Sequence, residues 1–262
     1  MVKTTYYQDL TRMNTFGMKV KARCFMEYDS VADLVDIEFS ELARPVLHIG
    51  GGSNLLFTDD FKGTVLHSKI DFIEILEEEQ TGEMKSYRHF DQAERVEKSA
   101  SEAYVSVGAG VVFDNFCAWA AREGLWGVEN LSYIPGEVGA SAVQNIGAYG
   151  VEVKDVIHKV YCYDTVEEEF VSFSVEECGY GYRDSIFKKP EVKGRYIVTH
   201  VVFALSRESK PRLDYGHLAS AVAGVISDGD DMPPPARGCP SLRGRGSAES
   251  DMTPATADAR CP

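Results

Sequence analysis

The chain has 262 residues, of which 44% are hydrophobic and 11% aromatic. This composition supplies a sizeable core and excludes disorder throughout the chain. Lys and Arg total 27 against 41 Asp and Glu, and the net charge of -14 excludes a general attraction to nucleic acid or to an anionic lipid surface. An anionic ligand must therefore be held by a local cluster of donors.

The cysteines and the chain start indicate where the protein works. The six cysteines contain no C-x-x-C pair, which argues against a zinc ribbon or a dithiol redox site and favours reduced thiols. The first nine residues lack the apolar core of a secretion signal, and no apolar stretch is long enough to span a membrane. We therefore expect a cytoplasmic protein without membrane insertion. The histidines show no metal-ligand spacing, so no metal site is expected.

The first half of the chain predicts two strands, each followed by a tight turn. Residues 45–49 form a β-rich run that ends at three glycines, and residues 104–107 end at a Gly-Ala-Gly turn. Ahead of the first run, Ser30 is expected to cap a helix that carries Val31, Leu34, Val35 and Leu42. After the second, helical spacing predicts a helix that stops at Gly124 and carries Phe113, Phe116, Cys117 and Ala120.

The rest of the pattern is mostly β. Residues 71–102 are strongly acidic, and the alternation at 72–76 predicts a partly exposed hairpin. Residues 161–164, 169–173 and 196–203 predict antiparallel strands. The fold class is therefore α+β. From 225 to 262 there is no aromatic residue and no lysine, so this tail is not expected to fold.

The sharpest local signal is the loop Gly50-Gly51-Gly52-Ser53-Asn54-Leu55, directly after a predicted strand. Glycines let successive N–H groups converge on one anion, and Ser53 and Asn54 add side-chain donors, so the loop suits a diphosphate. It matches neither a Walker A loop nor a Rossmann fingerprint. The alternative is a strained turn between two strands, and at this point both interpretations stay open.

A second stretch runs from 127 to 150. Five glycines, small residues and neutral amides recur there with no charge after Glu137, which suits a backbone laid along a flat, uncharged ligand such as a flavin ring. The alternative is a tightly packed loop with a short helix.

A third stretch, 179–189, gathers Arg183, Lys188 and Lys189 in an otherwise acidic chain. A guanidinium offers a planar fork for a carboxylate, which makes Arg183 the candidate catalytic residue. The alternative is a surface ion pair between Arg183 and Asp184.

These three stretches, together with residues 14–17 and 213–216, resemble the UDP-N-acetylenolpyruvoylglucosamine reductase (UDP-N-acetylmuramate dehydrogenase) family over residues 10–223. The resemblance implies a two-subdomain FAD-binding fold of the vanillyl-alcohol-oxidase or p-cresol-methylhydroxylase type, at residues 1–70 and 71–224. It further implies that residues 225–262 are a disordered or aberrant tail in place of the family's substrate domain.

The resemblance also implies cofactors, partners and site residues. FAD would be held non-covalently, with NADPH as hydride donor and UDP-N-acetylglucosamine enolpyruvate as substrate, in peptidoglycan (cell wall) biosynthesis and hence in cell shape and division. The cofactor-binding residues would be Gly50, Gly51, Gly52, Ser53, Asn54, Leu55, Ile134, Pro135, Gly136, Ser141, Gln144, Asn145 and Gly147. The substrate-binding residues would be Tyr149, Tyr182, Arg183 and Tyr215.

The family's later domain supplies a serine that protonates the enol carbon and a glutamate near the C-terminus, and no stretch of this sequence matches either. Since general acid steps contribute about 10²- to 10⁴-fold, turnover is expected to be severely slowed. Two further functions stay open: a non-catalytic flavin- or nucleotide-binding remnant, and another oxidase on the same FAD fold.

Overall fold

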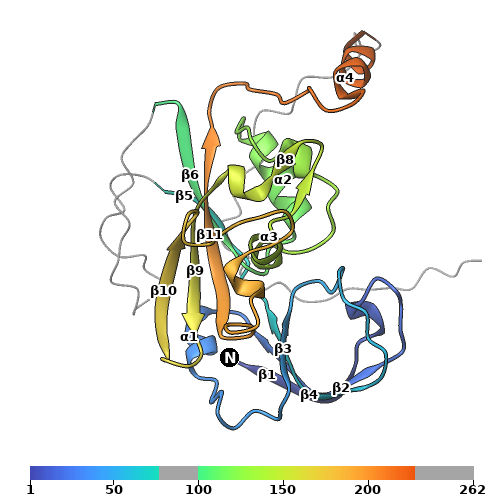
Figure 1. Cartoon of the computed structure of the whole chain (residues 1–262), viewed down its shortest axis with the longest axis vertical. Helices are drawn as coiled ribbons and strands as arrows, with labels where there is room; N and C mark the ends of the chain where they lie inside the picture. The colour runs from blue at the N-terminus through green and yellow to red at the C-terminus, as the bar shows by residue number, and fades with distance from the viewer. Residues whose placement is uncertain (77–99, 228–262) are drawn as a thin grey trace, which may run out of the picture.

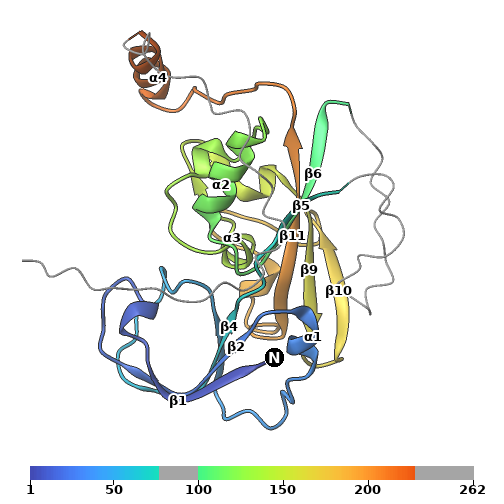
Figure 2. The ribbon, with the colours of Figure 1, turned by 180° about the vertical axis from the view of Figure 1, so that it is seen from behind.

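The computed structural model describes residues 1–76 and 100–227. Two β-sheets form the body of this part of the chain, and α2 and α3 lie against the larger sheet (Figure 1). Seen from behind, the smaller sheet lies below the larger one, with α3 close to the junction (Figure 2).

The smaller sheet has the strand order β1-β2-β4-β3. Its strands are β1 (Lys3–Asp9), β2 (Lys21–Tyr28), β3 (Val46–Ile49) and β4 (Phe61–Ser68). β1 is antiparallel to β2, whereas β2 and β3 both run parallel to β4. The carboxyl ends of β2, β3 and β4 therefore meet at one edge of the sheet.

The helix expected after Ser30 is shorter than the sequence pattern indicates. Ser30 does cap α1 (Val31–Val35), where its Oγ accepts a hydrogen bond from Asp33 N, but Leu42 lies outside the helix. The chain leaves the helical path at Asp36 because Ile37 and Phe39 turn inward and are buried in the core. The expectation of a helix reaching Leu42 was therefore wrong.

The larger sheet has the order β10-β9-β11-β6-β5, and every pairing in it is antiparallel. Its strands are β5 (Ile73–Ile75), β6 (Glu102–Gly108), β9 (Ile157–Asp164), β10 (Glu169–Ser174) and β11 (Tyr196–Ser206). The antiparallel strands predicted at 161–164, 169–173 and 196–203 are confirmed. β5 pairs with β6, and residues 77–99, which connect the two strands of the predicted hairpin, lie outside the described residues.

Helices and short turns link the strands. The helices are α2 (Phe113–Arg122), α3 (Val138–Gln144) and α4 (Leu218–Ser227), and a small hairpin joins β7 (Gly147–Ala148) to β8 (Val151–Glu152). Single turns of 3₁₀ helix lie at Thr11–Met13, Glu129–Leu131, Val153–Asp155 and Ile186–Lys188. α4 continues three residues past Gly224, and the rest of the tail, 228–262, lies outside the described residues.

The core explains why these segments form these elements. The predicted helical spacing is confirmed in α2, whose apolar face buries Phe113, Phe116, Cys117 and Ala120. A second cluster joins the two sheets, since Tyr28 and Leu66 of the smaller sheet pack with Tyr163 and Ile197 of the larger one. The fold is α+β, and its two sheets meet near residues 69–72.

Candidate functional site

The glycine loop takes its position from the parallel strands before it. Ile49, the last residue of β3, is the register partner of His67 near the end of β4. The loop 50–54 therefore begins beside the carboxyl end of β4. Such an edge of parallel strands is a frequent ligand-binding position.

Gly52 of this loop fits where a side chain could not, and a side chain on Gly50 would crowd its neighbours. Gly52 has a φ of +69°, and a Cβ there would lie 1.8 Å from the carbonyl oxygen of Met13. A Cβ on Gly50 would lie 3.2 Å from both Ala140 Cβ and Glu137 Oε2. The loop thus passes close to its neighbours because its glycines have no side chains.

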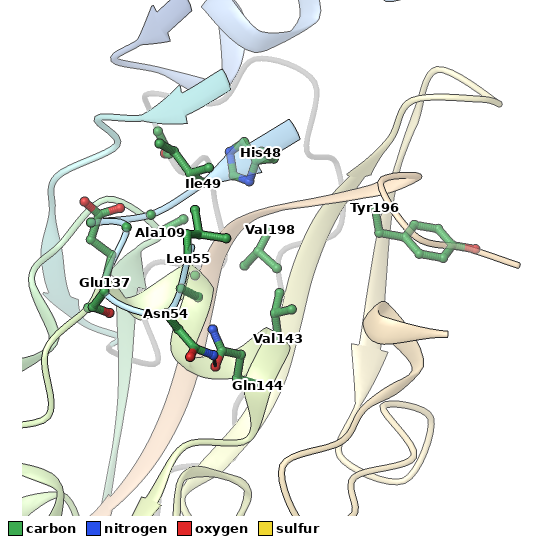
Figure 3. Close-up of a pocket in the computed structure, with 18 residues that line it drawn as sticks. His48, Ile49, Asn54, Leu55, Ala109, Glu137, Val143, Gln144, Tyr196 and Val198 are labelled. Atoms are coloured by element: carbon green, nitrogen blue, oxygen red, sulfur yellow. Dashed lines mark hydrogen bonds between the residues drawn. The ribbon is translucent and has the colours of Figure 1, made fainter. Parts of the chain in front are cut away.

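Three side-chain hydrogen bonds hold the loop against distant segments. Thr15 Oγ1 donates to the carbonyl oxygen of Ser53 at 2.9 Å, and Ser53 Oγ donates to that of Pro135 at 2.9 Å. Asn54 Nδ2 donates to Gln144 Oε1 at 2.7 Å, and the two amide groups face each other in the close-up (Figure 3). The loop is fixed from two sides before any ligand binds.

The backbone N–H groups of the loop remain available. Within the described chain, the N–H groups of Gly51, Gly52, Ser53 and Asn54 donate to no protein acceptor. Consecutive N–H groups of this kind form an anion-binding nest. A diphosphate fits this donor set, and the glycines leave the space that it needs.

The first residues of α3 are held by backbone hydrogen bonds to the turn that follows β6, and the helix lies beside the glycine loop. Val138 N donates to Val111 O at 2.9 Å and Gly139 N to Ala109 O at 3.0 Å. A Cβ on Gly139 would lie 2.8 Å from Ala109 Cβ, so a side chain there would push α3 away. The turn at 108–110 packs in the same way on the backbone of residues 68–70, so its glycines serve close packing.

A pocket lies between the loop, α3 and the start of β11 (Figure 3). The expected cofactor residues that line it are Gly50, Gly51, Gly52, Ser53, Asn54, Leu55, Gly136 and Gln144. Residues of the loop and of the 134–147 segment, far apart in sequence, thus meet in one pocket. Its other lining residues are His48, Ile49, Ser68, Ala109, Glu137, Gly139, Ala140, Val143, Tyr196 and Val198.

The remaining expected cofactor residues do not line this pocket. Pro135 borders it through the bond from Ser53, and Ile134 packs on the core. Ser141 is buried and its Oγ donates to Val138 O at 2.7 Å, while Gly147 lies in β7. Asn145, buried with a φ of +46°, donates from Nδ2 to Gly181 O at 2.8 Å.

That bond to Gly181 brings the loop of Arg183 to the end of α3. Gly181 and Asp184 exchange backbone hydrogen bonds of 3.0 and 3.1 Å, so Tyr182 and Arg183 form the exposed tip of a tight turn, with Arg183 at a φ of +50°. Asp184 pairs with Lys189 at 2.7 Å, and no ion pair of Arg183 is found among the described residues. The alternative interpretation, an Arg183–Asp184 ion pair, was wrong. Arg183 does not line the pocket.

Two of the other expected substrate residues, Tyr149 and Tyr215, lie together although they are far apart in the sequence. The rings of Tyr149 and Tyr215 lie edge to face with centroids 6.0 Å apart, and both are more than half exposed. Asn130 Nδ2 donates to Tyr149 O at 3.2 Å and to Arg212 O at 2.8 Å, which holds the two segments together. Tyr149 has a φ of +49°, a strained conformation of the kind that concentrates at functional sites.

A buried charged cluster, which was not predicted from the sequence, lies beside the pocket. Glu137 and His67 are almost fully buried, and Glu137 Oε1 lies 3.0 Å from His67 Nε2. His67 Nδ1 lies 3.2 Å from Glu27 Oε1. Burial opposes a charge on His67, but its contacts with Glu137 and Glu27 outweigh burial and raise its pKa above the usual 6.5. Of these three residues only Glu137 stood out in the sequence, as the last charge before the uncharged residues 138–150.

A second histidine, the half-buried His48 at the pocket, behaves in the opposite way. His48 Nε2 lies 2.7 Å from the hydroxyl of Tyr28, and burial, with the nearby His67, lowers the pKa of His48 to about 4. His48 is therefore neutral at pH 7. Within residues 1–76 and 100–227, no cluster of His, Cys, Asp and Glu could hold a metal ion. No helix of the same residues is long and apolar enough to cross a membrane.

Comparisons with known proteins agree with this geometry. The sequence is 50% identical over 206 residues to the UDP-N-acetylenolpyruvoylglucosamine reductase of Bacteroides fragilis (strain YCH46), covering 78% of this chain and 55% of that protein. It is 44% identical over 220 residues to that of Neisseria meningitidis serogroup A, covering 83% and 58%. The chain thus spans little more than half the length of these curated relatives.

A solved structure and a family profile support the fold. The crystal structure of UDP-N-acetylenolpyruvylglucosamine reductase (MurB) from Thermus caldophilus aligns with a TM-score of 0.55 at 25% identity, over 89% of this chain and 71% of that one. The family described as FAD binding domain matches residues 23–171, more than half of the chain. The resemblance and the α+β FAD-binding fold expected from the sequence are confirmed, and the chain belongs to the FAD-binding domain family.

Proposed function

We propose that this chain is the flavin-binding part of a UDP-N-acetylenolpyruvoylglucosamine reductase and that it holds FAD in the pocket between the glycine loop and α3. The observation that carries the proposal is that four loop N–H groups, which have no acceptor in the described chain, meet the glycines and amides of the 134–147 segment at one pocket. The relatives named above support the choice of reaction.

The diphosphate of FAD would lie on the N–H groups of 51–54. The flavin ring would lie along the segment that holds Ile134, Pro135, Gly136, Ser141, Gln144, Asn145 and Gly147. The neutral amide of Gln144, already fixed by Asn54, offers a hydrogen-bonding edge there. Ser141 and Asn145 would act indirectly, since their side chains hold α3 and the turn 181–184.

When bound, FAD supplies hydride transfer from NADPH to the enolpyruvyl double bond of UDP-N-acetylglucosamine enolpyruvate. Arg183 would stabilise the enolate-like carboxylate that forms as hydride adds. The Arg183 side chain is exposed and the neighbouring Asp184 pairs with Lys189, so Arg183 can accept an anionic substrate without first breaking an ion pair. Tyr149, Tyr182 and Tyr215, all exposed, would contact the UDP-sugar.

The cellular role follows from the proposed reaction. The product, UDP-N-acetylmuramate, feeds peptidoglycan synthesis, and we place the chain in the cytoplasm, where its role in cell wall biogenesis would support cell shape, cell division and the cell cycle. The domain division at residue 70 and the tail from 225 belong to the same proposal. The two sheets, which meet near 69–72, support the first of these boundaries.

The test is a flavin titration followed by two half-reactions. The purified chain should bind FAD, NADPH should bleach the visible flavin bands, and the enolpyruvyl substrate should restore them. Bleaching without restoration by that substrate would favour the non-catalytic remnant. Recovery driven by oxygen together with a different substrate would favour another oxidase. A chain that binds no FAD would contradict the whole proposal.

A further inference from the structure

Glu137 is the single acidic side chain among the described residues that line the pocket, and its two oxygens have different surroundings. Oε1 lies 3.0 Å from His67 Nε2. Oε2 has no hydrogen-bond partner in the described chain and lies 3.2 Å from the position of a Cβ on Gly50. The close-up shows the carboxylate directed toward the glycine loop, away from Gln144 (Figure 3).

A buried carboxylate is costly unless it is paired, and His67 supplies the pair. His67 is the register partner of Glu27 in the β2–β4 pairing, so a carboxylate contacts each of its ring nitrogens. Only a protonated imidazole donates from both nitrogens. His67 thereby fixes Oε1 and leaves Oε2 facing the pocket. The other charged or titratable groups around His67 are Lys69, His48 and Lys3, which reaches Glu27 at 3.8 Å.

Because Glu137 Oε2 has no partner in the described chain, it favours a ligand group that donates a hydrogen bond. A diphosphate has no donor at neutral pH and is repelled by a carboxylate, whereas the sugar hydroxyls that flank it in a dinucleotide are donors. We propose that Glu137 binds a sugar hydroxyl of the dinucleotide through Oε2, and that His67 is the positioning residue that holds the carboxylate in place. This inference rests on the proposed function, in which the pocket takes FAD.

The test measures the affinity of the chain for FAD and for FAD analogues that each lack one hydroxyl of the ribityl chain or of the adenosine ribose. Glu137→Ala should weaken FAD binding about tenfold to a hundredfold, the value of a hydrogen bond to a charged group. For the analogue that lacks the contacted hydroxyl, the same substitution should have no effect. Glu137→Gln keeps the shape of the side chain and replaces Glu137→Ala if the latter fails to fold. Glu208→Ala, at an exposed position outside the pocket, is the matched control.

His67→Gln tests the positioning role through the pH profile. FAD affinity of the native chain should fall as the pH rises through the raised pKa of His67 and the imidazole loses its proton, and His67→Gln should show no such step. An equal loss for FAD and for every analogue would overturn the role of Glu137, and identical pH profiles would overturn that of His67. In both cases the proposed function would stand, since the native chain would still bind FAD. A native chain without FAD affinity would overturn both.

Discussion

Asn54 and Gln144 stand 90 residues apart in the chain and share a hydrogen bond of 2.7 Å. Asn54 belongs to the loop that follows β3 of the smaller sheet, and Gln144 ends α3, which packs on β11 of the larger sheet. This bond therefore joins the two halves of the site across the pocket. It fixes the relative position of the segments proposed to hold the diphosphate and the flavin.

We expect Asn54→Ala and Gln144→Ala to act as a coupled pair. Each should weaken FAD binding several-fold, and a double-mutant cycle should give a coupling free energy of about 0.5–1.5 kcal/mol, the worth of a side-chain hydrogen bond. Asn54 is exposed, so urea unfolding of the chain without FAD should change by less than about 1 kcal/mol. Strictly additive losses in FAD affinity would show that the bond does not organise the site.

Gly52→Ala should destabilise the chain and abolish FAD binding. The added Cβ would have to move the carbonyl oxygen of Met13, 1.8 Å away, in addition to the cost of a positive φ. Gly17→Ala is the matched control, since Gly17 has a φ of +61° and a Cβ there meets nothing within 4 Å. The control isolates the conformational cost, about 1–2 kcal/mol. Urea unfolding should show a clearly larger loss for Gly52→Ala, and equal losses would contradict the close packing of the loop.

Local patterns predicted much of the fold. Apolar spacing gave α2, alternation with β-branched residues gave β6, β9, β10 and β11, and the loop after β3 was found from its glycines alone. The helix predicted after Ser30 was too long because Leu42 continues the apolar spacing in the sequence. In the structure, burial of Ile37 and Phe39 outweighs that spacing.

The charged part of the site could not be predicted in the same way. Glu27 and His67 are neighbours only because β2 and β4 are parallel and in that register, which no local pattern specifies. Glu137 comes close to His67 because backbone hydrogen bonds hold the start of α3 against the turn after β6. Contacts of this kind depend on the sheet topology, so a histidine in an apolar strand reads as an ordinary core residue.

Stability should fall as the pH rises above 6.5 because of His67. Its folded pKa is raised above 6.5, so the stability that its contacts with Glu137 and Glu27 contribute is complete below pH 6.5 and is lost as the pH rises through the folded value. Urea unfolding from pH 6 to 9 should show this loss in the native chain and a flatter profile in His67→Gln. The same slope in both proteins would contradict a charged, buried His67.

Stability should also fall on the acid side because of His48. Its folded pKa of about 4 lies below 6.5, so its contribution is complete above pH 6.5 and is lost as the pH falls toward 4. The difference corresponds to on the order of 3 kcal/mol. His48→Gln should flatten the unfolding free energy between pH 6.5 and 4. An unchanged acid slope in this variant would assign the acid loss to other groups.

Arg183→Ala should separate binding from turnover. Because Arg183 is exposed and makes no ion pair in the described chain, the substitution should change stability by less than about 0.5 kcal/mol and leave FAD affinity intact. Reoxidation of the bleached flavin by the enolpyruvyl substrate should slow at least about 10²-fold. Arg183→Lys should recover part of this rate, since it keeps the charge but loses the planar fork. Lys188→Ala is the neighbouring control. An equal slowing of reoxidation in that variant would show that Arg183 contributes only positive charge and has no specific role.

Flavin fluorescence during titration of FAD into the purified chain tests the central claim most directly, with Gly52→Ala and Gly17→Ala measured alongside. If the pocket between residues 50–54 and α3 holds FAD, the native chain and Gly17→Ala will quench the flavin at one equivalent, and Gly52→Ala will not. Unchanged fluorescence with the native chain, or full quenching by all three proteins, would contradict this assignment.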